Sequence, residues 1–567
     1  MAEENHETRT MPERTYQIPP GDTNAPPMRK LTDLYGGKTL LKRLCEAVQA
    51  SGEITIYGDY DADGVMSVYI LYAGLSRLAP DRVNWFVNNR FDDGYSITAD
   101  SMKKCLSRYP QTKTLITCDN GINAAEAVDY AMEKGILVLV TDHHVQTVPL
   151  RDDCPAVDEK SIKQVESDLA SGVIPDECCG AELARRVVEA LFDDMGCSDE
   201  HRDFLDGLYA YSGLATIADV VPMNPSNHAV ARKGLQLLQK EEGFWGFLKE
   251  EFIPKTKRIH GETIGFYYGP LLNASSRMTG EATHAVNMLL SYDGGDEAAC
   301  RSAIQALVKL NHERRELSAH DDEIANGIIE TENLASMPFI MVWSEQFSEG
   351  VNGLTAAHIT ERYRVPCAVL SPTKLDPDVY KGSARSVEGA DLIKLLQKHT
   401  DLVQAGGHGM AAGLSVRKEH LETVRTLLCE DLKGFQAPPE AEPDYDYQTD
   451  RLTRKDAAFH EYLTEAYEPF GPGFEEPRIA FTGKAENLWR NKGKNTDELV
   501  HAVFPMGNSA DGILVKANWW NHLKEAEQWY EKGKVLHCRG KIAYDVYTNR
   551  EGREYRSLQI TISRLLN

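Results

Sequence analysis

The sequence predicts an α/β protein of several domains, with a parallel sheet first and a β-rich region last. Three observations predict this order. Short apolar runs alternate with helical stretches near the N-terminus, a mostly helical region follows, and closely spaced strands end the chain. Strands that alternate with helices form parallel sheets from βαβ units. At 567 residues, the chain is also too long for one ordinary hydrophobic core.

Four buried strands are expected in the first domain, because short continuous apolar runs are typical of parallel sheets. These runs are residues 53–57, 83–87, 113–118 and 135–140. Helical periodicity fills the stretches between them, at residues 65–77, 101–108 and 123–134.

A second α/β unit begins at the strand 339–343, and a Pro-rich acidic stretch separates it from the C-terminal region. Five short strands in that region predict a small barrel such as an OB-fold. They are residues 479–484, 498–504, 512–516, 535–543 and 557–562. The expected segments are a disordered arm over 1–28, the parallel-sheet domain over 29–225, a helical connector over 226–335, a smaller α/β domain over 336–434, a linker over 435–447 and the barrel over 448–567.

Composition describes ordinary globular material, with 42% hydrophobic and 26% charged residues. No apolar run reaches the length of a membrane span and no secretory signal opens the chain, so no membrane contact is expected.

The eleven cysteines include no C-x-x-C pair, which favours a reducing cytoplasm. The net charge of −24 counts against a nucleic-acid ligand without excluding one, because positive potential can be confined to one groove.

Acidic and imidazole side chains directly follow three of the expected strands. The first strand leads into residues 57–64 (Tyr-Gly-Asp-Tyr-Asp-Ala-Asp-Gly), the third into Asp119, and the fourth into Asp142, His143 and His144. Ligands of parallel sheets bind beyond the carboxyl ends of the strands. Five carboxylates and two imidazoles are therefore expected in one crevice, where the carboxylates repel one another unless cations separate them.

This donor set predicts a site for divalent cations. Carboxylates with an imidazole suit Mn²⁺ or Mg²⁺, and the alternating Asp59, Asp61 and Asp63 fit two neighbouring ions. Such a pair of ions supports displacement at phosphorus. The alternative for Asp-x-Asp-x-Asp is an EF-hand calcium loop, which needs a glutamate at the twelfth position, where this chain has Ile70.

The motifs resemble those of the DHH phosphoesterase superfamily in their order along the chain. Residues 59–64, 119–121 and 142–144 are similar to three successive motifs, and residues 215–222, which contain Asp219, are similar to a fourth. Residues 406–413 (Gly-Gly-His-Gly-Met-Ala-Ala-Gly) resemble the glycine-rich signature of the associated DHHA1 domain.

Finer resemblances favour the RecJ-like nucleases of this superfamily. Residues 89–95, 264–278 and 382–386 are similar to RecJ segments that place arginines, a tyrosine and a serine beside the site. Tyr57 stands where many relatives have histidine, which transfers that ligand role to Asp59. Such departures are typical of a divergent member, encoded by a virus or a mobile element. The expected location is the cytoplasm of a bacterial or phage-infected cell.

The resemblance implies a role for each of these side chains. Two divalent ions, Mn²⁺ or Mg²⁺, are held by Asp61, Asp63, Asp119, His143 and Asp219, with Asp59 at the second ion. The catalytic residues are His144 as hydrogen-bond donor or proton carrier, Asp142 as the group that orients a histidine, and Asp59. The substrate-binding residues are Arg90, Tyr95, Arg277, Ser383, Arg385, Gly407 and His408. A weaker pattern of basic and aromatic residues predicts a DNA platform of Trp489, Arg490, Lys492, Lys494 and Lys541.

The implied function is an exonuclease on single-stranded DNA, with 5′-to-3′ polarity, in recombination and repair or in phage-type DNA metabolism. Single-stranded DNA is the expected partner, together with a helicase and a single-strand-binding protein. Two alternatives stay open. One is a phosphodiesterase of the same superfamily that cleaves dinucleotides or short oligoribonucleotides, and typically lacks the long connector and the barrel. The other is an inactive scaffold that binds a helicase, as eukaryotic relatives of RecJ do, and has lost acidic ligands.

Overall fold

The computed structural model divides the chain into two compact units, one ending at Pro439 and one beginning at Glu440. The residues that the structure describes are 28–94, 96–171, 175–256, 258–373, 376–407, 409–438, 447–449, 452–492, 499–509, 512–520, 522–532, 535–548 and 553–565. Within these ranges, every helix is too short or too polar to serve as a membrane span.

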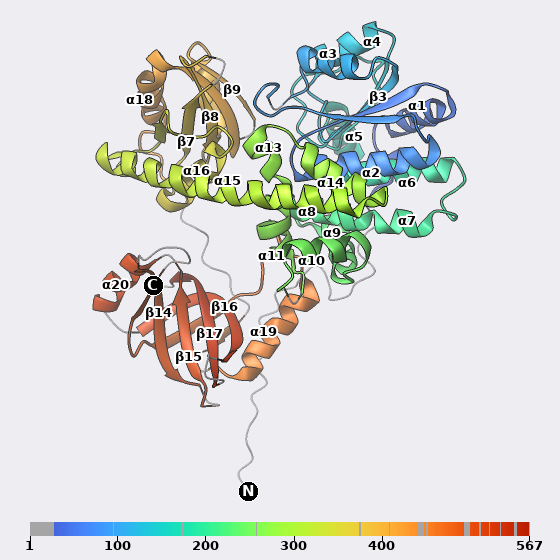
Figure 1. Cartoon of the computed structure of the whole chain (residues 1–567). Helices are drawn as coiled ribbons and strands as arrows, with labels where there is room; N and C mark the ends of the chain where they lie inside the picture. The colour runs from blue at the N-terminus through green and yellow to red at the C-terminus, as the bar shows by residue number, and fades with distance from the viewer. Residues whose placement is uncertain are drawn as a thin grey trace. The chain divides into compact units, whose positions relative to one another are not determined.

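The first sheet is fully parallel, with the strand order β2-β1-β3-β4-β5 (Figure 1). Its strands are β1 (Glu53–Gly58), β2 (Val83–Val87), β3 (Thr112–Cys118), β4 (Leu137–Thr141) and β5 (Ala156–Val157). The predicted parallel sheet is confirmed, with the four expected strands within two residues of their predicted bounds. The two-residue β5 was not predicted, because so short a strand has no readable periodicity.

Helices cover both faces of this sheet, because alternate strand residues point to opposite sides. One core joins the sheet to α1 (Gly37–Gln49), α2 (Ala62–Leu78) and α6 (Gly180–Asp194). A second core joins the opposite face to α3 (Ala99–Arg108) and α4 (Ala125–Glu133). The carboxyl ends of the strands are left to carry the loops with the acidic residues.

A mostly helical region, which includes the expected connector over 226–335, follows α5 (Ile162–Ser171) and α6. It contains α7 (Arg202–Gly207), α8 (Tyr209–Ala218), α9 (Pro225–Gln239), α10 (Gly243–Phe252), α11 (Gly261–Thr263), the π-helical η2 (Ile264–Tyr268), α12 (Gly269–Leu272), α13 (Ala274–Thr279), α14 (Thr283–Asp293) and α15 (Glu297–Thr331). The 35 residues of α15 contact α13 and α14 as well as α16 and β6, so this helix reaches from the first sheet's helices to the second sheet (Figure 1).

The second sheet is mixed, with the strand order β6-β7-β8-β10-β9. Its strands are β6 (Ile340–Trp343), β7 (Cys367–Pro372), β8 (Val379–Arg385), β9 (Val403–Gly407) and β10 (Ala411–Arg417). One face packs on α15 and α16 (Asn352–Tyr363), and the other on α17 (Leu392–Leu396) and α18 (Leu421–Asp431). The predicted second α/β unit is confirmed.

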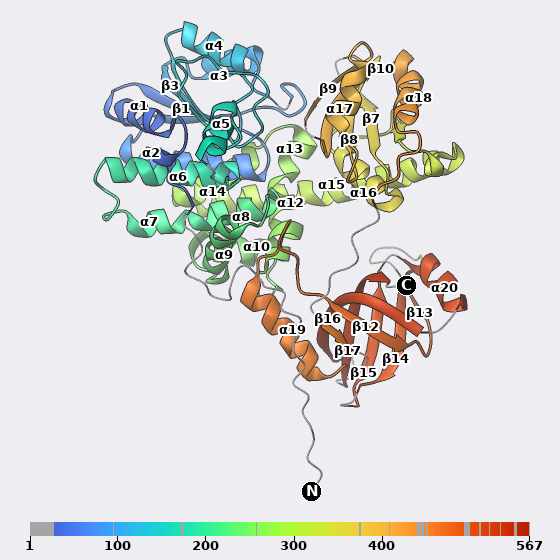
Figure 2. The same cartoon turned by 180° about the vertical axis from the view of Figure 1, so that it is seen from behind.

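The C-terminal unit contains a seven-stranded mixed sheet, ordered β11-β12-β16-β17-β15-β14-β13 (Figure 2). Its elements are β11 (Tyr447–Thr449), α19 (Arg454–Tyr467), β12 (Ile479–Lys484), β13 (Trp489–Lys492), β14 (Leu499–Asn508), β15 (Leu514–Trp519), α20 (Leu523–Lys532), β16 (Val535–Thr548) and β17 (Glu554–Leu565). All five predicted strands are present. The strand pairings do not show closure of this sheet, so the barrel stays a prediction.

Candidate metal centre

The loop after β1 carries three aspartates, and the start of α2 fixes its shape. Asp61 is the N-cap of α2, and its carboxylate accepts hydrogen bonds from the backbone amides of Asp63 and Gly64, both at 3.0 Å. A side chain on Gly64 would collide with the backbone of Asp59. The tight turn that gathers the three aspartates therefore requires glycine at residue 64.

Asp63 is held by the first turn of α6, far away in the chain. Its two carboxylate oxygens accept hydrogen bonds from the backbone amides of Gly180 at 2.7 Å and Ala181 at 2.8 Å. A helix N-terminus favours such negative charge. A Cβ atom on Gly180 would lie 2.6 Å from Cβ of Asp119, so Gly180 packs closely between Asp63 and Asp119. Gly180 is not among the predicted site residues, because no local pattern marks it.

The ends of β3 and β4 add Asp119 and His143. Asp119 has a left-handed backbone with φ of 55°, an uncommon conformation that clusters at functional sites. Nε2 of His143 lies 2.9 Å from Oδ1 of Asp119, 3.5 Å from Oδ2 of Asp63 and 3.9 Å from Oδ2 of Asp219. Asp219 is the C-cap of α8, directly after Ala218. Four segments of the chain thus bring their side chains to one point.

These spacings fit divalent cations. In an octahedron with bonds of about 2.1 Å, neighbouring ligand atoms lie about 3 Å apart and opposite ones about 4 Å apart. Oδ1 of Asp119 is buried and makes no hydrogen bond within the described residues, although Nε2 of His143 lies 2.9 Å away. Ligand atoms lie within 4.8 Å of one another in three overlapping groups: Asp119, His143 and His144; Asp63, His143 and Asp219; and Asp59, Asp61 and Asp119. The structure therefore gathers all six predicted metal ligands, in a donor set that suits Mn²⁺ or Mg²⁺.

Burial makes ionisation of these carboxyl groups unfavourable. Burial first, and neighbouring carboxylates second, raise the pKa of Asp59 and Asp219 to about 8 and the pKa of Asp63 to about 6. The same two causes raise the pKa of Asp119 well above its usual range. The cluster therefore needs positive charge from a ligand before all its members can ionise at neutral pH.

The metal-free protein is expected to be less stable at pH 8 than at pH 5. The raised pKa values of Asp59, Asp63 and Asp219 mean that the folded state binds more protons than the unfolded state, so stability falls as the pH rises from about 4 to about 8. Saturating Mn²⁺ should remove this loss, because the cation takes the place of the protons. Thermal melting of chelated protein at both pH values, with and without Mn²⁺, measures the effect. A metal-free protein that melts later at pH 8 would contradict it.

Asp142 orients His144 rather than His143. Its Oδ1 lies 2.8 Å from Nδ1 of His144, and its Oδ2 accepts a hydrogen bond from the backbone amide of Ile122 at 2.9 Å. Burial would raise the pKa of Asp142, but the charge and hydrogen bond of His144 lower it to about 2. Burial would lower the pKa of His144, but Asp142 raises it to about 10. In the metal-free protein these interactions favour the protonated form of His144, whose side chain is 41% exposed.

The helices α12 and α13 connect the expected arginines to the metal loop. Oδ1 of Asn273, between these helices, accepts a hydrogen bond from the backbone amide of Ala62 at 2.8 Å. The backbone amide of Arg90 donates to the carbonyl oxygen of Gly280 at 2.7 Å. Arg277 lies on α13, between these two contacts. Asn273 is a supporting residue that was not singled out from the sequence.

The second sheet presents Ser383 and Arg385 from β8. A Cβ atom on Gly353, in the first turn of α16, would lie 3.3 Å from Oγ of Ser383 and from Nη2 of Arg385. A Cβ atom on Gly350 would collide with the carbonyl group of Arg277. The loop that enters α16 is therefore packed against the helix that carries Arg277, which joins the two sheets of this unit beside the expected substrate site.

Gly407 ends β9 with φ of 132°, a conformation that favours glycine. Tyr95, His408 and Lys494 lie outside the described residues.

The C-terminal sheet distributes the expected platform residues over two faces. One cross-strand row contains Trp489, Val503, Asn518, Thr561 and Lys541. Side chains in one such row share a face of the sheet. Arg490 points to the opposite face, where it pairs with Glu527 of α20 at 2.6 Å. Lys492 follows an irregularity in the pairing of β13.

Asp158 and Lys160 follow β5, at the same sheet edge as the metal ligands. The backbone amide of Asp142 donates to the carbonyl oxygen of Val157 at 3.1 Å, which brings Asp158 beside the end of β4. Asp158 is buried, and burial raises its pKa well above the usual range. These two residues were not predicted, because β5 is too short to be recognised.

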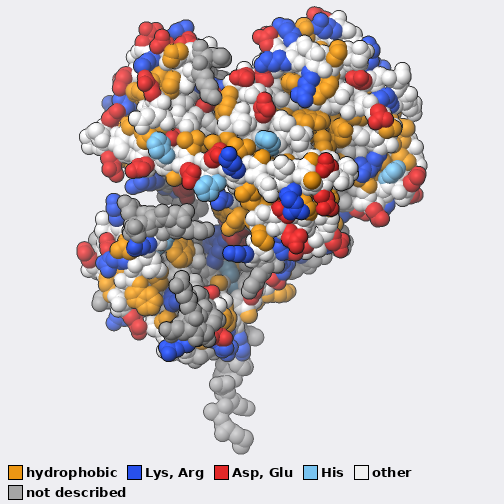
Figure 3. All heavy atoms as spheres, viewed as in Figure 1, with side chains coloured by type: hydrophobic (Ala, Val, Ile, Leu, Met, Phe, Trp, Pro, Cys, Tyr) orange, Lys and Arg blue, Asp and Glu red, His pale blue; other side chains and the backbone are white. Residues whose placement is uncertain are grey.

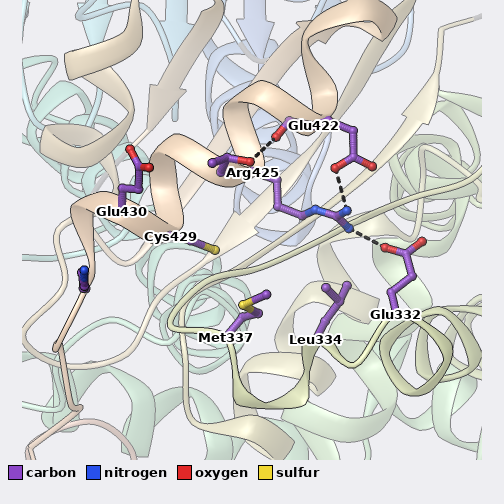
Figure 4. A pocket seen from close by; sticks show the side chains of 9 residues that line it. Glu332, Leu334, Met337, Glu422, Arg425, Cys429 and Glu430 are labelled. Carbon is purple, nitrogen blue, oxygen red and sulfur yellow. Dashed lines mark hydrogen bonds and ion pairs between the residues drawn. The ribbon is translucent and has the colours of Figure 1, made fainter.

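A pocket of about 570 Å³ lies away from the predicted site residues, between the end of α15 and α18 (Figure 4). Arg425 in this pocket is held between Glu332 and Glu422, each at 2.6 Å. Its charge is already paired, so this pocket is not an anion site.

The comparisons with known proteins agree with this geometry. The family model "DHH family, N-terminal domain" matches residues 53–213, and the model "DHHA1 domain" matches residues 336–434. The single-stranded-DNA-specific exonuclease RecJ of Haemophilus influenzae is 28% identical over 551 residues, which cover 93% of this chain and 90% of that protein. RecJ of Bacillus subtilis is 30% identical over 403 residues, which cover 70% of this chain and 48% of that protein.

A solved structure extends the likeness to the fold of nearly the whole chain. RecJ of Thermus thermophilus in complex with Mn²⁺ is similar with a TM-score of 0.73 at 23% identity, covering 96% of this chain and 73% of that chain. Both family domains and the relatives lead to one assignment. The chain belongs to the DHH family of proteins that carry a DHHA1 domain, within the RecJ group.

Proposed function

We propose that this protein is a metal-dependent exonuclease that hydrolyses the phosphodiester bonds of single-stranded DNA. The observation that carries this proposal is the edge of the first sheet, where six carboxylate and imidazole ligands lie beside His144, whose Nδ1 is held by Asp142. Two divalent cations in such a set support displacement at phosphorus. The relatives named as RecJ supply the substrate class.

In this mechanism the chain holds the cations, orients one histidine and binds the strand. Bound Mn²⁺ or Mg²⁺ would supply hydroxide near neutral pH and offset negative charge on the phosphate. The proposed ligands are Asp61, Asp63, Asp119, His143 and Asp219, with Asp59 at the second cation. Asp142 holds Nδ1 of His144, so that Nε2 is directed to donate a proton or a hydrogen bond to a phosphate oxygen.

Arg90, Arg277 and Arg385 bind backbone phosphates in this proposal. A guanidinium is always charged and can grip phosphate oxygens with two parallel hydrogen bonds. The close backbone contacts among their segments support a single binding groove for the strand. Lys and Arg lie interspersed with Asp and Glu on the visible face (Figure 3), and a negative net charge still permits positive potential within one groove. Ser383 and Gly407 would add a hydroxyl and a backbone amide.

Polarity, partners and location complete the proposal. A 5′-to-3′ direction and the partnership with a helicase and a single-strand-binding protein rest on the resemblance to RecJ. The free thiols of all eleven cysteines support a cytoplasmic location. The long α15 and the C-terminal sheet support a long strand rather than a dinucleotide as substrate. The complete set of acidic ligands supports an active enzyme rather than a scaffold.

Strands labelled at one end test the proposal. With Mn²⁺, the protein should release labelled mononucleotides from a 5′-labelled single strand at once and from a 3′-labelled one only late, and a chelator should stop both. The matched duplex should resist, because its ends offer no single strand to the groove. A preference for dinucleotides, or equal cleavage of the duplex, would contradict the proposed substrate. Early release of the 3′ label would contradict the proposed 5′-to-3′ polarity and leave the rest of the proposal standing.

A further inference from the structure

A buried ion pair contacts Cys178, in the segment that enters α6 beside the metal centre. Arg186 of α6 is 3% exposed, and its Nη2 lies 2.5 Å from Oε1 of Glu159, which is 1% exposed. The same Nη2 donates to Sγ of Cys178 at 2.7 Å, and Nη1 donates to the carbonyl oxygen of Arg29 at 2.8 Å. Neither charged residue is among the groups proposed to touch a cation or the strand.

The pair holds the segment that enters α6. Oε2 of Glu159 accepts a hydrogen bond from the backbone amide of Cys178 at 3.3 Å, on the same residue whose sulfur contacts Arg186. Gly180 and Ala181 follow after Cys179, and their amides donate hydrogen bonds to the two carboxylate oxygens of Asp63. A continuous set of short contacts therefore leads from the buried pair to Asp63.

This segment has little freedom to move. Asp119 lies against Gly180 on the side where a Cβ atom would project. A displacement of residues 178–181 by a few tenths of an ångström would therefore shift the hydrogen bonds of Asp63 and the packing of Asp119 together. The spacing of two proposed metal ligands depends on where this segment sits.

Stability alone is a weak explanation for such a pair. The cost of taking two charges out of water can exceed their attraction, and well-packed apolar residues often replace a buried pair without loss. The neighbouring Arg185 offers a contrast. It is also buried on α6 and pairs with Glu182 at 2.7 Å and Glu189 at 2.9 Å, but both partners belong to the same helix. Within the described residues, the ion pairs of Arg185 do not involve Cys178.

We propose that Arg186 and Glu159 are positioning residues for the metal centre. They set the segment 178–181 so that two backbone amides meet Asp63, and they thereby raise the affinity of the site for a divalent cation. This inference rests on the proposed role of Asp63 and Asp119 as metal ligands.

The test compares Arg186→Lys with Arg185→Lys in the full chain. A lysine keeps the charge but loses the planar fork that reaches Glu159, Cys178 and Arg29 together. Arg186→Lys should lower the affinity for Mn²⁺ by about 10–100-fold, as changes to groups that support metal ligands do, while Arg185→Lys should stay within about threefold of wild type. Free Mn²⁺ measured by electron paramagnetic resonance reports the affinity without any turnover. The Mn²⁺ concentration for half-maximal cleavage should rise by the same factor, with little change in rate at saturation.

The outcomes separate the inference from the proposed function. Equal Mn²⁺ affinity in the two lysine variants would overturn the positioning role. If Arg186→Lys does not fold, Glu159→Gln and Glu159→Ala give the same comparison, because glutamine keeps an acceptor for the Cys178 amide and alanine removes it. Loss of Mn²⁺ affinity in the alanine variant, whether or not glutamine shares it, would support the inference, and wild-type affinity in both variants would overturn it. A wild-type protein that binds no Mn²⁺ would instead refute the proposed function.

Discussion

Replacing Asp119 by asparagine is expected to slow strand cleavage by more than about 100-fold, because even groups that merely support a metal ligand are worth about 10–100-fold. Asp119 belongs to two of the three ligand groups, and its Oδ1 lies 2.9 Å from Nε2 of His143. Asparagine tolerates the left-handed backbone at this position, so the substitution removes charge without adding backbone strain. Single-turnover cleavage of a labelled strand at saturating Mn²⁺ measures the loss.

The same variant should keep its fold and melt later than wild type when both are metal-free at pH 8. Burial raises the pKa of Asp119, so the substitution removes a carboxyl group whose ionisation is unfavourable in the folded state. Asp100→Ala is a matched control, since Asp100 is an exposed aspartate on α3 that pairs only with Lys103 in the ion pairs of the described chain. The Asp100→Ala control should change neither the rate of strand cleavage nor the melting temperature of the metal-free protein. Near-normal turnover in Asp119→Asn would remove this residue from the proposed ligand set.

Ending the chain after Pro438 is expected to weaken binding of a long strand on the order of 30- to 10⁴-fold. Stacking contributes about 1–3 kcal/mol per base, two such contacts would be lost, and about 1.4 kcal/mol corresponds to a factor of ten. The proposed ligands and arginines precede this cut, as does Phe435, which packs on the second-sheet core. Short oligonucleotides should therefore still be cleaved. Nucleotides released per binding event, counted against an excess of unlabelled trap strand, measure the effect.

A double substitution in the full chain checks that the loss comes from stacking. Trp489 of β13 and Trp520, directly after β15, are both exposed, and replacing both by alanine should reproduce part of the weakening. Unchanged release of nucleotides from a long strand by the shortened chain would assign the C-terminal unit to a partner instead. Loss of short-oligonucleotide cleavage in a folded, shortened chain would mean that this unit helps to build the active site.

The strand ends that carry the acidic residues could be predicted, because the sequence pattern that marks each of them is local. An apolar run, a sharp polar boundary and an acidic residue lie within ten residues of one another at β1, β3 and β4, and the parallel sheet then brings the ends together. The roles of Arg90, Arg277 and Arg385 came from the resemblance, since a surface arginine carries no local mark of function. These roles stay predictions.

The contacts that orient the ligands could not be predicted, because their partners lie far apart in the chain. Gly180 meets Asp63 across 117 positions, and Asn273 meets Ala62 across 211. No periodicity encodes such pairs. The faces of the platform residues were also not predictable, because the short strand β13 was not recognised from the sequence. In this strand the neighbouring residues Trp489 and Arg490 point to opposite faces of the sheet.

The length of α15 has a consequence for how this protein can evolve. At 1.5 Å per residue its 35 residues span about 52 Å, and both of its ends are packed, on α13 and α14 and on α16 and β6. Inserting one residue would rotate everything beyond it by about 100° and advance it by about 1.5 Å, which would disrupt the packing of this helix on α16 and β6. Insertions and deletions should therefore accumulate in the loops of both sheets and be purged from this helix. Selection must therefore preserve the length of this helix as well as its buried face.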